Sequence, residues 1–362
     1  MRKNRVLVLL ILVLAFPADL FSQEDKAKNG TWLSLPAISF SPETGFGFGG
    51  ASLRLFKLNP DDTIARSSQV RLLALYTTEK QFIFNTRYQL FTFGEDLFLT
   101  GRLEFLKFPE FYYGVGPGTE QSNEELVEYN FFGVENRVLK QLIPGFFSGL
   151  EFRYYTRFNY KLVENGLLES TTVAGYNGSE VAGLGPLFVI DKRDNIANSY
   201  KGYYLLVSSF FHGQILGGEF RYNNYRIDYR KYWKFNPNLE HILAFQFLGN
   251  FVEGRAPFHN LSLMGGSSLM RGYYRGRFRD NHFIGSQIEY RMPVWWRFGL
   301  VGFAGMGNVA NSVGDFRLSR MKPSYGGGLR ILIDETERLN MRLDFGFGDD
   351  TSGFYLNVTE AF

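Results

Sequence analysis

Cysteine is absent from this 362-residue chain, and histidine occurs only 4 times. The absence of thiols excludes disulfide scaffolds, cysteine-ligated metals and thiol catalysis. The histidines show no metal-ligand spacing, so we expect no metal and no cofactor. An excess of charge of one sign is also lacking, because the formal net charge is only +3, and we therefore expect no nucleic-acid partner.

Long hydrophobic runs are scarce as well, and the one that stands out is near the N-terminus. Arg2, Lys3 and Arg5 precede an apolar run at 6–16, and small or polar residues follow up to Ser22. A membrane-spanning helix needs about 20 apolar residues, so this run is too short to be one. The pattern is typical of a cleavable signal peptide at 1–22. It predicts export and leaves a short periplasmic N-terminal segment at 23–30.

Aromatic residues and glycine are abundant: Phe, Trp and Tyr make up 17% of the chain, and there are 40 glycines. Apolar residues alternate with polar residues or glycine at 284–292, 324–333 and 338–348. A period of two indicates strands with one apolar face. These segments are longer than the usual strand of about 5–6 residues. A closed membrane barrel, apolar toward lipid and polar toward its lumen, explains both features.

The alternation predicts sixteen strands, and bacterial outer-membrane barrels have an even number. The strands are expected at 31–41, 45–57, 68–78, 80–93, 97–107, 128–142, 145–158, 181–192, 202–213, 217–234, 238–252, 283–292, 297–307, 323–333, 338–348 and 352–362. Several odd-to-even connections are long and several even-to-odd turns are short, as in barrels with both termini in the periplasm. We therefore predict an all-β, sixteen-stranded antiparallel transmembrane barrel over 31–362, in the outer membrane of a Gram-negative bacterium.

The long connection at 253–282 carries five arginines, at positions 255, 271, 275, 277 and 279. A loop of this length without secondary structure is usually functional or disordered, and its many apolar residues argue against disorder. We expect it to fold into the lumen, where guanidinium groups can pair with carboxylates. Glu289 and Asp344 occupy positions of nearby predicted strands that, by the alternation, face the lumen. The alternative is a basic external loop that binds lipopolysaccharide phosphates.

At 266–273 the sequence Gly-Ser-Ser-Leu-Met-Arg-Gly-Tyr resembles a known motif. It is similar to the Arg-Gly-Phe/Tyr motif in the sixth external loop of the BamA/TamA-like superfamily, the bacterial surface antigen barrels of sixteen strands. The motif residues here are Arg271, Gly272 and Tyr273. The resemblance implies an outer-membrane barrel with this loop inserted in its lumen.

Further stretches resemble the family in the same order along the chain. They are a strand–turn–strand at 183–204 with Asp191, Arg193 and Asp194 in its turn motif, and the segments 289–293, 326–330 and 342–346. The resemblance covers nearly the whole chain after the signal peptide and is strongest from about residue 183. These segments bring Arg330 and Arg342 into the set of expected lumen residues beside Glu289 and Asp344.

Two departures from the family pattern bear on function. Gly305 stands where the family usually has the aspartate that meets the loop arginine, so we expect Glu289 or Asp344 to receive Arg271. The family usually carries periplasmic POTRA domains before the barrel, whereas only about eight to ten residues separate Gln23 from the first predicted strand. The chain thus resembles a POTRA-less branch, in which capture of clients by a periplasmic arm is in doubt.

In the family, a seam between the first and last strands opens laterally. Pro36, in the first predicted strand, cannot donate to the ladder, and a lost hydrogen bond makes opening easier by about 1 kcal/mol. The alternative is that Pro36 only begins the strand. Phe362 has the parity of Phe354, Leu356 and Val358, so we expect it on the lipid face beside the seam.

The resemblance implies a protein that aids insertion or translocation of outer-membrane polypeptides or lipids through this seam. The expected partners are outer-membrane lipids, lipopolysaccharide, client polypeptides or lipids, and either a second copy of the chain or an accessory periplasmic or lipoprotein subunit. One alternative is a passive porin or solute channel. A second is a barrel hydrolase built on His282 with Asp280 and Asn281. We can name no nucleophile with a positioned base, so we expect no catalytic residues and no enzyme activity.

Overall fold

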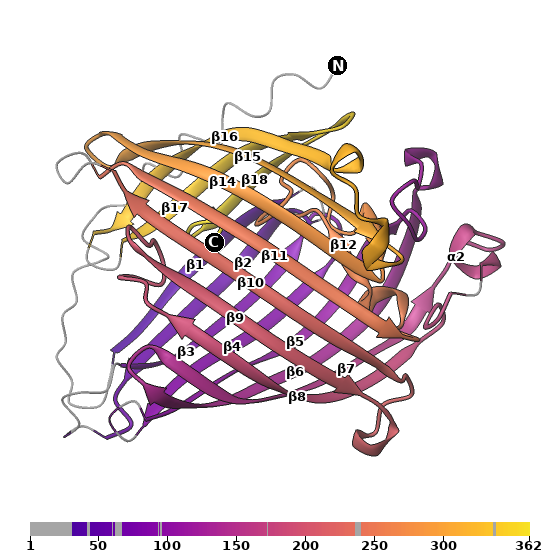
Figure 1. Cartoon of the computed structure of the whole chain (residues 1–362), viewed down its shortest axis with the longest axis horizontal. Helices are drawn as coiled ribbons and strands as arrows, with labels where there is room; N and C mark the ends of the chain where they lie inside the picture. Colours follow the sequence, from indigo (N-terminus) through magenta and orange to yellow (C-terminus); the bar gives the residue numbers. More distant parts are fainter. Residues whose placement is uncertain are drawn as a thin grey trace.

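The computed structural model describes residues 31–362, apart from 42–43, 60, 62–66, 93, 95, 172, 236–239 and 336–337. The expected signal peptide at 1–22 and the expected segment at 23–30 lie outside the described residues. Most of the described residues lie in β-strands, and these strands are tilted and form a barrel (Figure 1).

Sixteen strands close into one antiparallel barrel, which confirms the predicted fold class. They are β1 (Thr31–Ser41), β2 (Gly45–Phe56), β3 (Ser68–Thr77), β4 (Phe82–Thr92), β5 (Leu97–Tyr112), β6 (Glu125–Ile143), β7 (Phe146–Lys161), β8 (Ser179–Asp191), β9 (Gly202–His212), β10 (Tyr222–Lys234), β11 (Ile242–Gly254), β14 (His282–Trp295), β15 (Phe298–Ala310), β16 (Lys322–Asp334), β17 (Leu339–Gly348) and β18 (Thr351–Val358). Each strand pairs with its neighbours in the sequence, except that β11 pairs with β14 and β1 meets β18.

The two faces of the wall have opposite chemistry, and β14 shows this residue by residue. Ile288 and Tyr290 are 44% and 40% exposed, whereas Gln287, Glu289 and Arg291 are 4%, 0% and 4% exposed. Because successive side chains point to opposite faces, the apolar set lies outside and the charged set inside. Such an outward apolar band is what a transmembrane barrel presents to lipid.

The two ends of the barrel differ. The loop end carries the connections 113–124, 162–178 and 255–281, and the turn end carries the turns 144–145 and 192–201. The strands β5, β6 and β7 reach further toward the loop end than the alternation predicted. Helices are short and lie in the connections: α2 (Leu167–Ser170), η4 (Gln121–Asn123), η5 (Gln214–Leu216), η6 (Phe258–Asn260), η7 (Val313–Asp315) and η8 (Leu318–Arg320). Figure 1 shows α2 projecting beyond the barrel at the loop end. None of the helices in the described ranges has the length and hydrophobicity needed to cross a membrane.

The connection at 255–281, called loop six below, is not structureless as the sequence suggested. Its strands β12 (Ser262–Met264) and β13 (Phe278–Asp280) pair with each other in a separate two-stranded sheet. This pairing satisfies backbone groups that lie away from water, which a loop packed inside a barrel requires.

The last strand ends earlier than predicted, and this corrects the expected position of Phe362. β18 ends at Val358, Thr359 has a positive φ of 76°, and Glu360 and Phe362 are buried. Continued as a strand, the chain would place Glu360 on the lipid-facing parity of Leu356, where a carboxylate is unfavourable. The chain therefore turns into the lumen, and Phe362 lies neither on the lipid face nor in the seam.

A charge placed on the outer face should destabilise the barrel far more than one on a loop. Ile288 lies midway along β14 and faces outward, so Ile288→Arg is expected to lower the free energy of unfolding by about 2–4 kcal/mol. Leu318→Arg, in the exposed η8 of the loop 311–321, is the matched control and should change it little. Urea unfolding in lipid vesicles measures both, and equal costs would contradict the assigned faces.

Candidate functional site

Loop six packs into the lumen through an apolar patch of its own. Its members come from the loop and from the facing strands β14 and β15: Met264, Leu269, Met270, Tyr273, Phe278, Phe283 and Val309. Burial of these side chains holds the loop against the wall. It brings the Arg-Gly-Tyr motif down among the polar lumen residues of β14 to β18.

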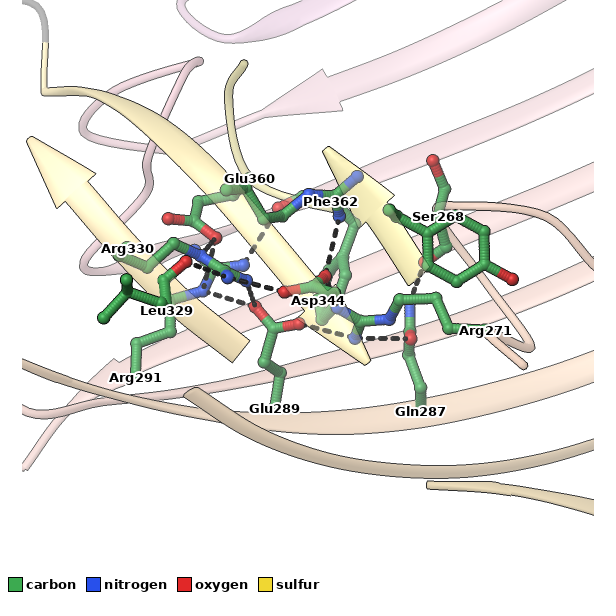
Figure 2. A network of polar contacts seen from close by, with 12 residues as sticks. Ser268, Arg271, Gln287, Glu289, Arg291, Leu329, Arg330, Asp344, Glu360 and Phe362 are labelled. Carbon is green, nitrogen blue, oxygen red and sulfur yellow. Dashed lines mark hydrogen bonds and ion pairs between the residues drawn. The ribbon is translucent and has the colours of Figure 1, made fainter. Parts of the chain in front are cut away.

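Arg271 lies at the centre of this site and is fully buried. Its Nη2 donates to Glu289 Oε2 at 2.6 Å, and its Nη1 donates to Asp344 Oδ2 at 2.6 Å (Figure 2). Both candidate carboxylates are therefore engaged, one on β14 and one on β17. Nη2 also donates to Gln287 Oε1 at 3.3 Å. The guanidinium stacks on the Phe303 ring, with 3.5 Å between its central carbon and the ring centroid.

The tip of the loop touches the wall backbone, and two glycines make this approach feasible. Gly272 has a φ of +107°, and a Cβ there would come within 2.6 Å of the Phe347 carbonyl carbon. A Cβ on Gly346 would come within 2.6 Å of the Arg271 carbonyl carbon. Only glycine accommodates both the left-handed backbone and the contact.

The rest of the motif ties the loop to the last three strands. The Tyr273 hydroxyl donates to the Pro323 carbonyl at 2.9 Å and accepts from the Asp349 N–H at 2.8 Å. The Gly272 N–H donates to the Tyr355 hydroxyl on β18 at 3.0 Å. Loop six is thus fastened to β16, to the β17–β18 turn and to the seam strand itself.

The network extends from Arg271 toward the turn end of the lumen. Arg330 Nη1 donates to Asp344 Oδ1 at 2.6 Å, and its Nε donates to Glu360 Oε2 at 2.7 Å (Figure 2). Arg291 Nε donates to Glu289 Oε1 at 2.8 Å. Each of Glu289 and Asp344 therefore accepts hydrogen bonds from two arginines, which joins the loop, the wall and the segment at Glu360 in one hydrogen-bonded unit.

The structure places the other expected residues as follows. Arg342 lies beside the network, with its Nη1 3.5 Å from Asp344 Oδ2. Arg193 forms a two-point pair with Asp191, through Nε at 2.9 Å and Nη2 at 2.8 Å. Asp194 accepts from the N–H groups of Tyr200 and Lys201 and so shapes the turn 192–201. Pro36 lies within β1, opposite Gly50, and so does not begin the strand.

The remaining loop arginines divide by burial. Arg277 and Arg279 are buried, and Arg277 donates to Thr119 and Gln121 of the connection 113–124. Arg255 and Arg275 are exposed at the loop end. The sequence thus predicted that loop six enters the lumen, but not that Arg277 would bond the neighbouring connection 113–124.

Sequence reasoning missed four members of the site: Gln287, Arg291, Phe303 and Glu360. The first three have the lumen parity, and Gln287 and Arg291 flank Glu289, so parity could have found them. Glu360 gave a weaker signal, a charge at a lipid-facing position of a predicted strand. Among the described residues, no group of three or more His, Asp and Glu side chains is placed to hold a metal ion.

A family model for the Omp85 superfamily domain matches residues 144–362, which include loop six and the whole network. The chain belongs to the Omp85 superfamily. No curated protein sequence matches the chain.

Solved structures show the same barrel at low identity. BamA from Haemophilus ducreyi lacking POTRA domains 1–3 is 12% identical, with a TM-score of 0.61, over 91% of this chain and 70% of that one. CdiB from Acinetobacter baumannii is 11% identical, with a TM-score of 0.55, over 91% of this chain and 60% of that one. CdiB from Escherichia coli is 9% identical, with a TM-score of 0.57, over 93% and 63%. These three proteins share the barrel fold of this Omp85 chain. The chain spans under two thirds of the length of either CdiB.

Reversing the central charge should damage this Omp85 barrel, whereas reversing a loop-end charge should not. Arg271→Glu removes one arginine from Glu289 and Asp344 and places a third carboxylate beside them, and breaking a buried ion pair costs about 3–5 kcal/mol. Arg255→Glu is the matched control, because an exposed charge contributes about 0–1 kcal/mol. The gel mobility difference between unheated and heated samples reports the folded fraction. Equal folded yields for the two variants would show that the network does not hold the barrel.

Filling the contact at the loop tip should displace the tip without adding charge. Gly346→Ala introduces a Cβ that overlaps the Arg271 backbone, so loop six should become accessible to added protease. Gly302→Ala is the control, since nothing lies within 4 Å of the added atom there. A loop that stays equally protected in both variants would contradict the close approach.

Proposed function

We propose that this Omp85 barrel aids insertion or translocation of outer-membrane polypeptides or lipids through the seam between β1 and β18. In this proposal, residues 1–22 export the chain to the outer membrane of a Gram-negative bacterium and residues 23–30 precede the barrel in the periplasm. The turn end faces the periplasm and the loop end faces the outside. The partners stay predictions: client polypeptides or lipids, lipopolysaccharide, and either a second copy of the chain or an accessory subunit.

One observation carries the proposal: the pairing at the seam is minimal. Within the described residues β1 and β18 share a single register pair, Phe40 with Leu356. In contrast, β1 pairs with β2 along its whole length, from Thr31 opposite Leu55 to Ser41 opposite Gly45. Each ladder hydrogen bond contributes about 0.5–1.5 kcal/mol, so the seam is the place where the wall separates at the lowest cost.

A shallow, mainly apolar hollow of about 480 Å³ lies over β1 to β4, where small residues such as Pro36, Gly50 and Ala74 adjoin Leu72 and Phe84. Pro36 and Gly50 are register partners in the β1–β2 pair, so the wall next to the seam carries little side-chain bulk at this level.

Loop six holds one side of the seam in place. The Gly272 N–H donates to Tyr355 on β18, and Thr351 Oγ1 donates to the Gly272 carbonyl at 2.9 Å. The last strand is therefore fastened to the lumen network. Opening would accordingly move β1 and β2 away from a stationary β18.

A disulfide across the seam should abolish the function. The chain has no cysteine, so Phe40→Cys with Leu356→Cys gives one defined crosslink between residues that are register partners. The oxidised protein should fail to replace the wild type in cells that lack the gene, and reduction should restore it. Full complementation by the locked protein would overturn lateral passage.

The matched control crosslinks β1 to its other neighbour. Ile38→Cys with Phe48→Cys joins register partners in the β1–β2 pair, which does not have to open, so this protein should complement. Planar-bilayer conductance tests the porin alternative. A wild-type conductance that survives deletion of 255–280 unchanged would favour a solute channel.

A further inference from the structure

Arg291 on β14 bonds three partners, one through each nitrogen of its guanidinium: Glu289 on its own strand and one residue in each of two other segments. Nε donates to Glu289 Oε1 at 2.8 Å, which links it to the loop-six anchor. Nη1 donates to Asn198 Oδ1 at 3.2 Å, in the turn 192–201. Nη2 donates to the Phe362 main-chain oxygen at 3.2 Å, in the segment 359–362. The planar fork of arginine holds three partners in fixed directions, which a lysine ammonium does less well.

The segment 359–362, called the tail below, lies inside the lumen at the turn end. Glu360 accepts from Arg330 Nε at 2.7 Å and from Asn340 Nδ2 at 2.8 Å. The Phe362 ring stacks on Tyr232, with 6.2 Å between the ring centroids. Ala361 packs with Ala244 in the same apolar cluster. Figure 2 shows Glu360 and Phe362 gathered around the arginines.

The turn 192–201 reaches the same place from the other side of the barrel. Asn195 Oδ1 accepts from the N–H groups of Ala197 and Asn198 and folds the turn inward, where Asn198 and Ser199 are buried. Arg338, from the turn between β16 and β17, donates to Asp194 Oδ2 at 2.8 Å. Since β9 and β16 are separated by four strands in the wall, this pair bridges across the turn end.

We propose that the tail and the turn 192–201 form a two-part plug of the turn end, and that Arg291 latches this plug to the loop-six anchor. The plug regulates access to the lumen, so this inference rests on the proposed function. Displacement of loop six removes Arg271 from Glu289, so Glu289 holds Arg291 less firmly and Arg291 in turn holds the tail less firmly. The two ends of the lumen are thereby coupled through a chain of shared carboxylates and arginines.

Cysteine labelling tests the plug directly, because the chain has no cysteine of its own. Ala361→Cys reports on the tail and Ser199→Cys reports on the turn, and both positions are buried. The probe is a water-soluble maleimide added to the folded barrel in lipid vesicles. Arg291→Gln is expected to speed labelling at both positions by at least about tenfold, since it removes a charged hydrogen bond to each segment. Arg297→Gln, at the exposed turn between β14 and β15, is the control and should change neither rate.

Two further variants separate the parts of the plug. Glu360→Gln weakens the tail alone and should speed labelling only at Ala361→Cys. Arg338→Gln weakens the turn alone and should speed labelling only at Ser199→Cys. If Arg291→Gln does not fold, as judged by gel mobility, these two keep the plug testable. Unchanged labelling in all folded variants would overturn it.

The coupling has its own test, in the Arg271→Gln variant. Arg271 touches neither the tail nor the turn in any contact described above, yet its loss should speed labelling at Ala361→Cys. Gly346→Ala, which displaces the loop tip without removing a charge, should do the same. Labelling that responds to Arg291→Gln but to neither loop variant would show a plug without coupling and would overturn the latch.

The labelling rates read the plug, whereas the Phe40–Leu356 crosslink reads passage through the seam. If labelling responds as expected but the locked seam still complements, the plug stands and the proposed function fails. If the locked seam abolishes complementation but labelling never changes, the proposed function stands and the plug fails.

Discussion

The structure depends on one constraint: an arginine enclosed in a barrel must find carboxylates, because an uncompensated buried charge is very unfavourable. Arg271 meets this requirement with Glu289 and Asp344, both at 2.6 Å. These two acids lie on different strands, so the arginine fixes loop six across the wall from β14 to β17. The loop position is then set by charge as well as by apolar packing, and its tip must approach the backbone so closely that Gly272 and Gly346 admit no side chain.

The barrel is strongly cross-linked in one region and minimally paired in another. Glu289 and Asp344 each accept hydrogen bonds from two arginines, and Arg330 also bonds Glu360, so loop six, β14, β16, β17 and the tail form one unit. At the opposite extreme, β1 and β18 meet at a single register pair within the described residues. The proposed passage through the seam rests on this contrast between a joined half and a minimally paired joint.

The sequence predicted most strands within a few residues, because alternation is a local property that reports the two faces directly. The same rule failed at the end of β18. The parity of Leu356 and Val358 continues to Phe362, yet Glu360 shares that parity and would face lipid. Local pattern could not weigh this conflict, since the arginines that attract Glu360 lie on β14 and β16, far away in the sequence. Parity puts Phe303 and Gln287 on the lumen side, but only the folded barrel shows that they contact Arg271.

The sequence by itself determined the number of strands, the face that each presents to lipid, and the insertion of an arginine-bearing loop. Each of these follows from residues that are neighbours along the chain or from the side that a strand buries. The tertiary structure alone decided that Arg271 takes both carboxylates, that the tail enters the lumen, and that Arg291 joins three segments. Arg271 and Asp344 are 73 residues apart, and such pairs exist only because closing the barrel sets particular strands side by side.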